Sequence, residues 1–408
     1  MVLEEMKSQA SGYFGWKVVR AAFLVAVFAW GVGFYGPSVF LQTLHADHGW
    51  SISIISIAIT VHFLFSAALV TCLPEAHQRF GVAGVTQAGV ALSVLGMLAW
   101  ANVQQPWQLF LAALLSGAGW AATSGAAIHA MVAPWFEKDR PKAISLAFNG
   151  ASIGGLVFTP LWVALIALFG FSIAAAVISA AMLAVLWPVA RQLLRPKPNN
   201  LDLTSNGSAK SDHQHERVTL PTSRASLLRD QRFVTISGAF ALGLFAQVGL
   251  FAHFITRLTP ELGSSGAAWA ISLTTICAVA GRTLFGWVLG DRDRRVVASI
   301  NFALQACGTG LLALGSGAPV LLCGCILFGL GVGNLTSLPP LIAQKEFAAG
   351  DVGRVVALIT AINQAVFALA PAVLGALRDL EGGYKVAFGL AACAQIAASI
   401  IVIAYRSR

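Results

Sequence analysis

One residue dominates the chemistry that this sequence could perform: Arg282, which lies inside the apolar run 267–290. It is about three or four residues from the centre of that run, or roughly 5 Å along a helix. All 17 acidic residues, by contrast, fall in loops, at the termini or at the ends of apolar runs. A planar guanidinium matches a carboxylate through two parallel hydrogen bonds. The pattern therefore predicts that Arg282 binds an anionic ligand.

Two structural roles for Arg282 stay open beside this one. Its side chain could extend toward Asp291, more than two turns further along the helix, or it could cap carbonyl groups at a helix end. An unpaired guanidinium in the hydrocarbon layer costs several kcal/mol, so one of these partners is required.

Further polar side chains lie within the apolar runs and could line a cavity with Arg282. Each on its own is commonly an interhelical hydrogen-bonding residue, but their convergence from several runs predicts a shared substrate site. They are Tyr35, Asn149, Gln247, His253, Asn363 and Gln364. Proton-coupled transport would use either the substrate acid itself or an intramembrane group that titrates near neutral pH, and these groups are His62, His129 and His253.

Enzyme chemistry is not supported by the motifs in this chain. Residues 150–154 (Gly-Ala-Ser-Ile-Gly) fit the nucleophile-elbow pattern, but that motif needs a strand-turn-helix context and lies here inside an apolar run. Cys323 and Cys325 have no second ligand pair at metal-binding spacing. The six cysteines fall in apolar runs and are expected to be small core residues. We therefore expect no catalytic residue, no metal and no cofactor.

The elements that must position these residues are membrane-spanning helices. The chain is 57% hydrophobic and 11% charged, against roughly 25% charged residues in soluble domains. Apolar runs of about 18 or more residues recur, and each can cross a bilayer as a helix. The expected spans are 18–43, 52–73, 82–103, 108–134, 143–169, 171–193, 233–258, 267–290, 296–315, 319–343, 355–377 and 384–405.

These twelve spans fall into two halves. A polar stretch rich in Pro, Asn and Ser predicts a cytoplasmic linker at 196–230, between six-helix halves at 1–195 and 231–408. The stretch from Asp139 to Pro160 has a weak echo between Asp351 and Pro371, as expected for a duplicated transporter. The fold class is thus an all-α integral membrane protein with twelve helices in two pseudo-symmetric halves.

The formal charge of +9 is distributed over alternate loops, which argues against a nucleic-acid partner. By the positive-inside rule the basic loops face the cytoplasm, so both termini are expected there. We expect a multi-pass monomer in the cell inner membrane. Small residues in the spans predict close helix packing, and Gly31, Gly33, Gly36 and Pro37 predict an irregular first span.

The sequence resembles one branch of a known family, the monocarboxylate transporter and oxalate/formate antiporter branch of the major facilitator superfamily. The similarity covers nearly the whole chain. Three stretches carry it: 31–40 (Gly-Val-Gly-Phe-Tyr-Gly-Pro-Ser-Val-Phe), 135–143 (Trp-Phe-Glu-Lys-Asp-Arg-Pro-Lys-Ala) and 281–287 (Gly-Arg-Thr-Leu-Phe-Gly-Trp). The resemblance implies the major facilitator fold, and it implies that Arg282 binds the substrate carboxylate.

Several positions depart from that branch. Animal monocarboxylate carriers have an Asp one turn before the arginine, where this chain has Ala278, and a first-span Lys near Ser38 is missing. The Lys that oxalate exchangers carry in span eleven is replaced by Asn363 and Gln364. A single cation suggests a singly charged cargo. The first cytoplasmic-loop motif is also altered, with Gln78 where the superfamily prefers Asp.

We therefore predict secondary transport of a small organic anion, most simply a monocarboxylate, by alternating access and with protons as a possible coupling ion. The alternatives are an organic-anion exchanger and an efflux pump for hydrophobic or uncharged compounds. A non-transporting membrane sensor would need a folded signalling domain, which neither the linker nor the short tails can supply. Besides the substrate and protons, the lipid bilayer is the only partner expected.

Overall fold

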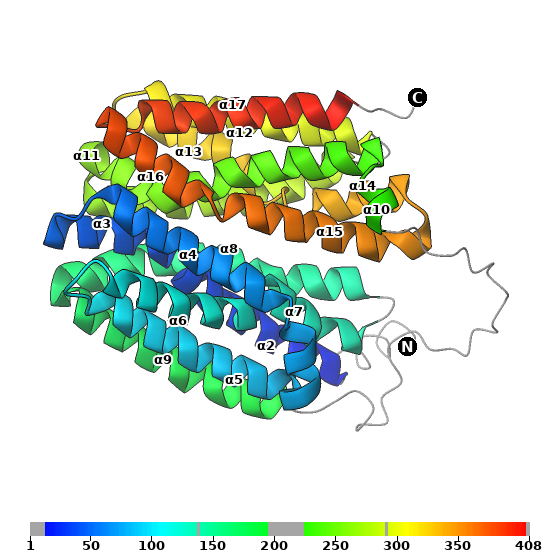
Figure 1. Cartoon of the computed structure of the whole chain (residues 1–408), viewed down its shortest axis with the longest axis horizontal. Helices are drawn as coiled ribbons and strands as arrows, with labels where there is room; N and C mark the ends of the chain where they lie inside the picture. Colours follow the sequence, from blue (N-terminus) through cyan, green and yellow to red (C-terminus); the bar gives the residue numbers. More distant parts are fainter. Residues whose placement is uncertain (1–12, 137–138, 195–223, 290–292, 405–408) are drawn as a thin grey trace, which may run out of the picture. The chain divides into compact units, whose positions relative to one another are not determined.

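The computed structural model describes residues 13–136, 139–194, 224–289 and 293–404, which form helices joined by short turns (Figure 1). No strand occurs within these ranges. The helices pack into two units, and residues distant in sequence share each unit. Of the described residues, the first unit contains 13–36, 65–136, 139–158 and 165–194, and the second contains 37–64, 159–164, 224–289 and 293–404.

The first unit is built mainly from the helices of the N-terminal half. Its elements are α2 (Phe14–Ala29), the π-helix η1 (Trp30–Phe34), α5 (Leu73–Ala101), α6 (Gln108–Thr123), α7 (Gly125–Val132), the 3₁₀ turn η2 (Ala133–Trp135), most of α8 (Arg140–Phe169) and α9 (Phe171–Leu193). The π-helix interrupts the first span where Gly31 and Gly33 predict an irregularity, so that prediction is confirmed. Its wider turn is closed by the Tyr35 amide, which donates to the Trp30 carbonyl at 2.9 Å.

Glycines bring α8 against α2 in this unit. A Cβ on Gly150 would overlap the Phe23 carbonyl, and one on Gly154 would lie 2.5 Å from the Val27 carbonyl. In lipid, helices associate through such close backbone approach rather than through the hydrophobic effect. The predicted packing role of these glycines is confirmed.

The second unit contains the C-terminal helices together with the segment 37–64. Its elements are α3 (Gly36–His48), most of α4 (Ile52–Val70), α10 (Arg224–Leu227), α11 (Gln231–Leu289), α12 (Arg294–Leu314), α13 (Ala318–Val332), α14 (Leu338–Glu346), α15 (Ala349–Phe367), α16 (Ala370–Glu381) and α17 (Lys385–Ala404). The long α11 consists of two limbs that meet at Gly263, whose φ of 68° favours glycine. These limbs correspond to the expected spans seven and eight.

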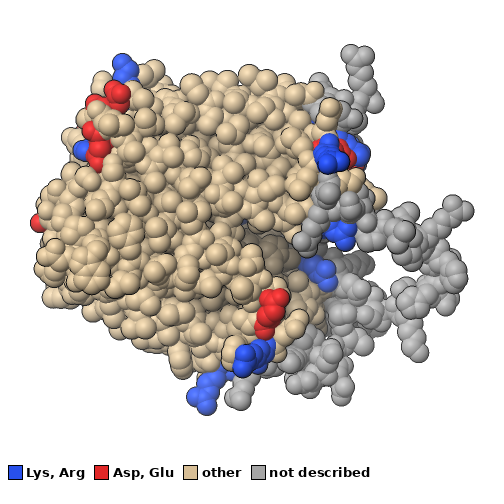
Figure 2. Space-filling view, in the orientation of Figure 1, with Lys and Arg blue, Asp and Glu red and all other residues tan. Residues whose placement is uncertain are grey.

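Ten described helices are long and apolar enough to cross a membrane. Dividing α11 at Gly263 and counting the shorter α13 with α14 as one broken span agrees with the twelve spans predicted. On the visible face, Figure 2 shows the described Lys, Arg, Asp and Glu side chains in a few small groups, with most of the surface uncharged. At about 1.5 Å per residue, the 20 residues of α17 extend about 30 Å, the thickness of a bilayer core.

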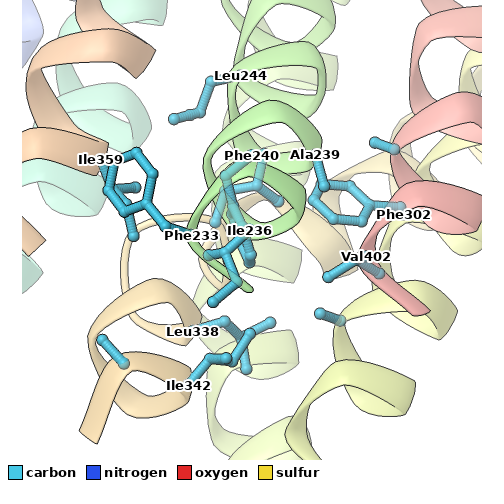
Figure 3. Close-up of a cluster of buried hydrophobic side chains, with 14 of the residues drawn as sticks. Phe233, Ile236, Ala239, Phe240, Leu244, Phe302, Leu338, Ile342, Ile359 and Val402 are labelled. Carbon is cyan, nitrogen blue, oxygen red and sulfur yellow. The ribbon is translucent and has the colours of Figure 1, made fainter. Parts of the chain in front are cut away.

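Buried side chains from six helices, α10, α11, α12, α14, α15 and α17, form the core at one end of the second unit (Figure 3). α11 contributes Phe233, Ile236 and Phe240, and the other helices contribute Phe302, Leu338, Ile342, Ile359 and Val402. The Phe240 and Phe302 rings meet edge to face, with their centroids 5.2 Å apart. This core joins the N-terminal parts of α11 and α12 to α14, α15 and the C-terminal part of α17.

The cysteines correct one expectation. We expected small core residues, but Cys325 alone is buried, Cys277 is half-buried, and the other four thiols are exposed on the protein surface. In a membrane protein the surface facing lipid is also apolar, so hydropathy does not separate a core position from a lipid-facing one.

Candidate functional site

Arg282 lies on the second limb of α11, where that limb touches α13 backbone to backbone. A Cβ on Gly281 would overlap the Leu330 carbonyl, and Cβ atoms on Gly329 and Gly333 would lie 2.6 Å and 2.5 Å from the carbonyls of Thr274 and Ala278. Gly329 and Gly333 thus form a pair of small residues one turn apart. This close contact allows the half-buried Arg282 side chain to reach α13.

The Arg282 side chain binds the end of α13. Its Nε donates to the Gly333 carbonyl at 3.2 Å. That carbonyl lies where α13 stops and turns begin, so no continuous helix supplies it with a backbone donor. The carbonyl-capping role that the sequence left open is therefore seen at Nε, whereas Asp291 lies outside the described residues. A carboxylate-binding role stays a prediction.

The Asp that animal carriers place before the arginine has no counterpart in the structure. Ala278 is buried, and its carbonyl faces Gly333. No carboxylate can therefore act from this position.

Two amides predicted to line the site are buried in the second unit with unsatisfied oxygens. Gln247 is on the first limb of α11 and Asn363 is on α15, and these two helices pack together. The Gln247 Oε1 and Asn363 Oδ1 atoms have no hydrogen-bond partner among the described residues. Buried amides usually have partners, so both are suited to meeting a polar ligand. The neighbouring Gln364 is half-buried.

His253 is engaged on both sides of its ring. It is fully buried, with Nε2 3.0 Å from the Pro371 carbonyl and Nδ1 3.1 Å from the Tyr384 hydroxyl. A carbonyl can only accept, so Nε2 carries a hydrogen, and in the neutral ring Nδ1 accepts from the tyrosine. His253 therefore ties α11 to the first turn of α16 and to the residue before α17, and its predicted contact with substrate stays a prediction.

The other two histidines differ from each other in exposure. His62 is buried on α4, and His129 is exposed on α7, where its ring centroid lies 5.3 Å from that of Phe148. Among the described residues no three His, Cys, Asp or Glu side chains gather as metal ligands would.

The remaining predicted site residues, Tyr35 and Asn149, belong to the first unit, whereas the other five belong to the second. Tyr35 is buried directly after the π-helix, and Asn149 is half-buried on α8. An aromatic cluster lies beside them, with the Trp30 ring 4.9 Å from Trp120 and 5.8 Å from Phe148 between centroids. π-helices often mark functional positions, so this region is a second candidate surface for ligand contact.

The structure also contains a charge network that the sequence reasoning missed. Arg295 appears in the sequence as one of several loop cations, yet it is only 2% exposed. Its Nε and Nη2 donate to the two carboxylate oxygens of Glu346 at 2.6 Å and 2.7 Å. Its Nη1 donates to the Thr235 hydroxyl and the Val402 carbonyl, both at 2.9 Å. The apolar residues directly after Arg295 were the available signal that this arginine begins a buried helix.

These features define a polytopic α-helical membrane protein whose two units each contain broken or irregular spans. The sequence matches the Major Facilitator Superfamily over residues 21–371, and the chain belongs to that family. It is a transporter and not an enzyme.

Curated relatives include Monocarboxylate transporter 13 of Rattus norvegicus, 26% identical over 401 residues, covering 96% of this chain and 89% of the relative. Another is MFS-type transporter 1 of Ophiocordyceps sp., 26% identical over 351 residues, covering 82% and 72%. Among solved structures, a variant of the nucleoside transporter NupG aligns with a TM-score of 0.73 at 14% identity, covering 96% of this chain and 99% of that one. The peptide transporter POT aligns at 0.71 and 16%, covering 95% and 93%. These structures show the fold alone.

Proposed function

We propose that this protein is a secondary active transporter of a small organic anion, specifically a monocarboxylate, and that it works by alternating access. The observation that carries the proposal is the placement of Arg282. This arginine is half-buried within the second limb of α11 and reaches the end of α13. Curated relatives named monocarboxylate transporters support the same substrate class. In this proposal Arg282 binds the substrate carboxylate, because a guanidinium pairs with this group through two parallel hydrogen bonds.

A transport assay with two arginine variants tests the proposal. Arg282→Gln should lose most uptake of the monocarboxylate in proteoliposomes and most of its binding. Arg257→Gln is a matched control, since Arg257 is also on α11 and donates to carbonyls at the end of α12, those of Leu312 at 2.9 Å and Gly315 at 2.8 Å. If both variants transport and bind the monocarboxylate like the wild type, Arg282 is only a capping residue. Export of an uncharged apolar compound that is unaffected by Arg282→Gln would favour the efflux alternative.

We extend the proposal to proton coupling, in which the proton travels with the anion. The engagement of both His253 nitrogens and the alanine at position 278 favour the substrate acid itself as the proton carrier. A pH dye trapped in the proteoliposome lumen should report acidification during uptake. Transport that ignores an imposed pH gradient and leaves the lumen unchanged would exclude coupling and favour exchange.

The proposed location is the inner membrane, with both termini in the cytoplasm. The distribution of basic loops supports this orientation. Cysteine labelling from each side of intact cells, with residues introduced into the basic loops and into the opposite loops, would test it.

A further inference from the structure

The tenth span is built with a hinge. α13 ends at Val332, turns follow over 333–337, and α14 begins at Leu338. Pro339 and Pro340 occupy the first turn of α14, so their missing N–H groups cannot continue the helix hydrogen bonds across the break. The break is therefore set by the local sequence.

Arg282 is attached to the first carbonyl of this hinge. Nε reaches the Gly333 oxygen because glycine leaves room: a Cβ at position 333 would lie 3.2 Å from Nε and 2.5 Å from the Ala278 carbonyl. The Nε side of the guanidinium is thus held by the hinge backbone.

Three other arginines hold α14, two at its last residue and one near its middle. Arg232 Nη1 donates to the Glu346 carbonyl at 2.9 Å, Arg294 donates to the Leu341 carbonyl, and Arg295 binds the Glu346 carboxylate with two bonds. The nine residues of α14 are therefore fixed at their C-terminal end, and the hinge at their N-terminal end meets Arg282. Any displacement between α13 and α14 must change the surroundings of Gly333.

We propose that Gly333 is a positioning residue for Arg282, and that through it the occupancy of the anion site is coupled to the hinge of the tenth span. The proposal rests on the proposed function, since it assumes that Arg282 meets the substrate. The Gly333 carbonyl orients the guanidinium about Nε, and an anion on that guanidinium shifts the balance of hinge conformations through the same bond. Gly281 and Gly329 assist by allowing α11 and α13 to touch.

A ligand-free measurement tests the tether by itself. Hydrogen exchange of the amides in 333–337 should be about 3–10-fold faster in Arg282→Gln than in the wild type, the change expected for losing one hydrogen bond. Arg257→Gln should leave these amides unchanged and should instead speed exchange near Gly315. Equal exchange at 333–337 in Arg282→Gln and the wild type would overturn the proposal, whatever the substrate is.

A pair of glycine variants tests the positioning. Gly333→Ala and Gly329→Ala create equivalent clashes, with carbonyls at 2.5 Å and 2.6 Å, but only the first meets Arg282. Thermal shifts with sodium acetate, pyruvate and benzoate measure affinity, and unfolding without ligand measures stability. We expect similar losses of stability but about tenfold weaker anion binding in Gly333→Ala alone.

The outcomes separate the two proposals. If the wild type binds an anion and Arg282→Gln does not, equal affinities of the two glycine variants would overturn the positioning role and leave the proposed function standing. If the wild type binds none of acetate, pyruvate and benzoate, the proposed function fails and the proposed coupling fails with it. The hydrogen-exchange experiment still decides whether Arg282 holds the hinge.

Discussion

The two ends of the second unit use polar groups in opposite ways. At one end the Arg295 side chain is buried, and its N–H groups are satisfied by Glu346, Thr235, Val402 and the Arg232 carbonyl. These contacts join the beginnings of α11 and α12 to the ends of α14 and α17. A buried guanidinium is tolerated when its donors are all paired, and here they are.

At the other end, the segment 37–64 meets the C-terminal helices through a few separate hydrogen bonds. The Ser53 amide, in the first turn of α4, donates to Asp379 Oδ2 at 2.7 Å, and the Ala372 amide donates to the Thr60 hydroxyl at 3.0 Å. Asp379 also accepts from Arg378 at 2.9 Å, and its side chain is 22% exposed. A carboxylate here caps the N-terminus of a helix more than 300 residues away in sequence.

The contacts at the two ends differ in how much free energy is lost when they open. All partners in the Arg295 network belong to the C-terminal half, and several buried hydrogen bonds are lost at once if it opens. The Asp379 contacts link distant parts of the chain, and water can replace them at modest cost because they are partly exposed. We therefore expect the first end to resist local opening more strongly than the second.

The largest expected effect comes from removing one partner of the buried ion pair. Glu346→Ala should lower the stability of the purified protein by about 3–5 kcal/mol, because it leaves Arg295 buried without its counter-charge. Thermal unfolding in detergent measures this. Glu381→Ala removes an exposed acid of the same unit and should change stability little. A double replacement, Arg295→Met with Glu346→Leu, should recover most of the loss, and failure to recover would show that geometry rather than charge is needed.

The Asp379 contact should have a smaller effect, confined to its own end. Asp379→Asn weakens the cap on α4 by about 0.5–2 kcal/mol, as for loss of a helix N-cap. Hydrogen exchange at the first turn of α4 should rise while the Arg295 end keeps its protection. Arg378→Gln retains the carboxylate and should affect α4 less. Equal loss of protection at both ends would contradict the distinction between them.

Removing one hydroxyl near Asp379 should cost less again. Tyr384→Phe deletes the donor to His253 Nδ1 and leaves that nitrogen buried without its partner, for about 1 kcal/mol. Unfolding midpoints measure the loss. If Tyr384→Phe also abolished proton coupling, His253 would be part of a proton path rather than a structural link from α11 to α16.

The smallest effect is a pH dependence at the first end. The hydrogen bond from the Arg232 side chain holds the pKa of Asp230 below its ordinary value. The contact therefore stabilises the fold above the unfolded pKa, near 3.9, and this contribution disappears as the pH falls through the lowered value. For a pair this exposed it is worth about 0.2–1 kcal/mol. Asp230→Asn should reduce the fall in the free energy of unfolding at acid pH by that amount. An unchanged fall would show that other carboxylates cause it.

Most of the helical architecture was predictable from the sequence, because hydropathy is a local property. The apolar runs match the observed helices closely, and the glycines near Gly31 correctly indicated an interrupted first span. The site was predictable only in part. Arg282 stood out as an arginine within an apolar run, but its bond to Gly333 depends on two spans whose contact no local pattern specifies.

A helical membrane protein with an arginine inside a span follows from the order of residues, since burial in lipid and its cost depend on composition along each helix. The hydrogen-bond partners of the buried polar groups follow only from how the helices pack. Arg295 appears as a loop cation until Glu346 is brought to it, and His253 appears as a titratable group until Pro371 and Tyr384 occupy both ring nitrogens. Hydrogen-bond partners are chosen by distance in space, and Glu346 and Tyr384 lie 51 and 131 positions along the chain from Arg295 and His253.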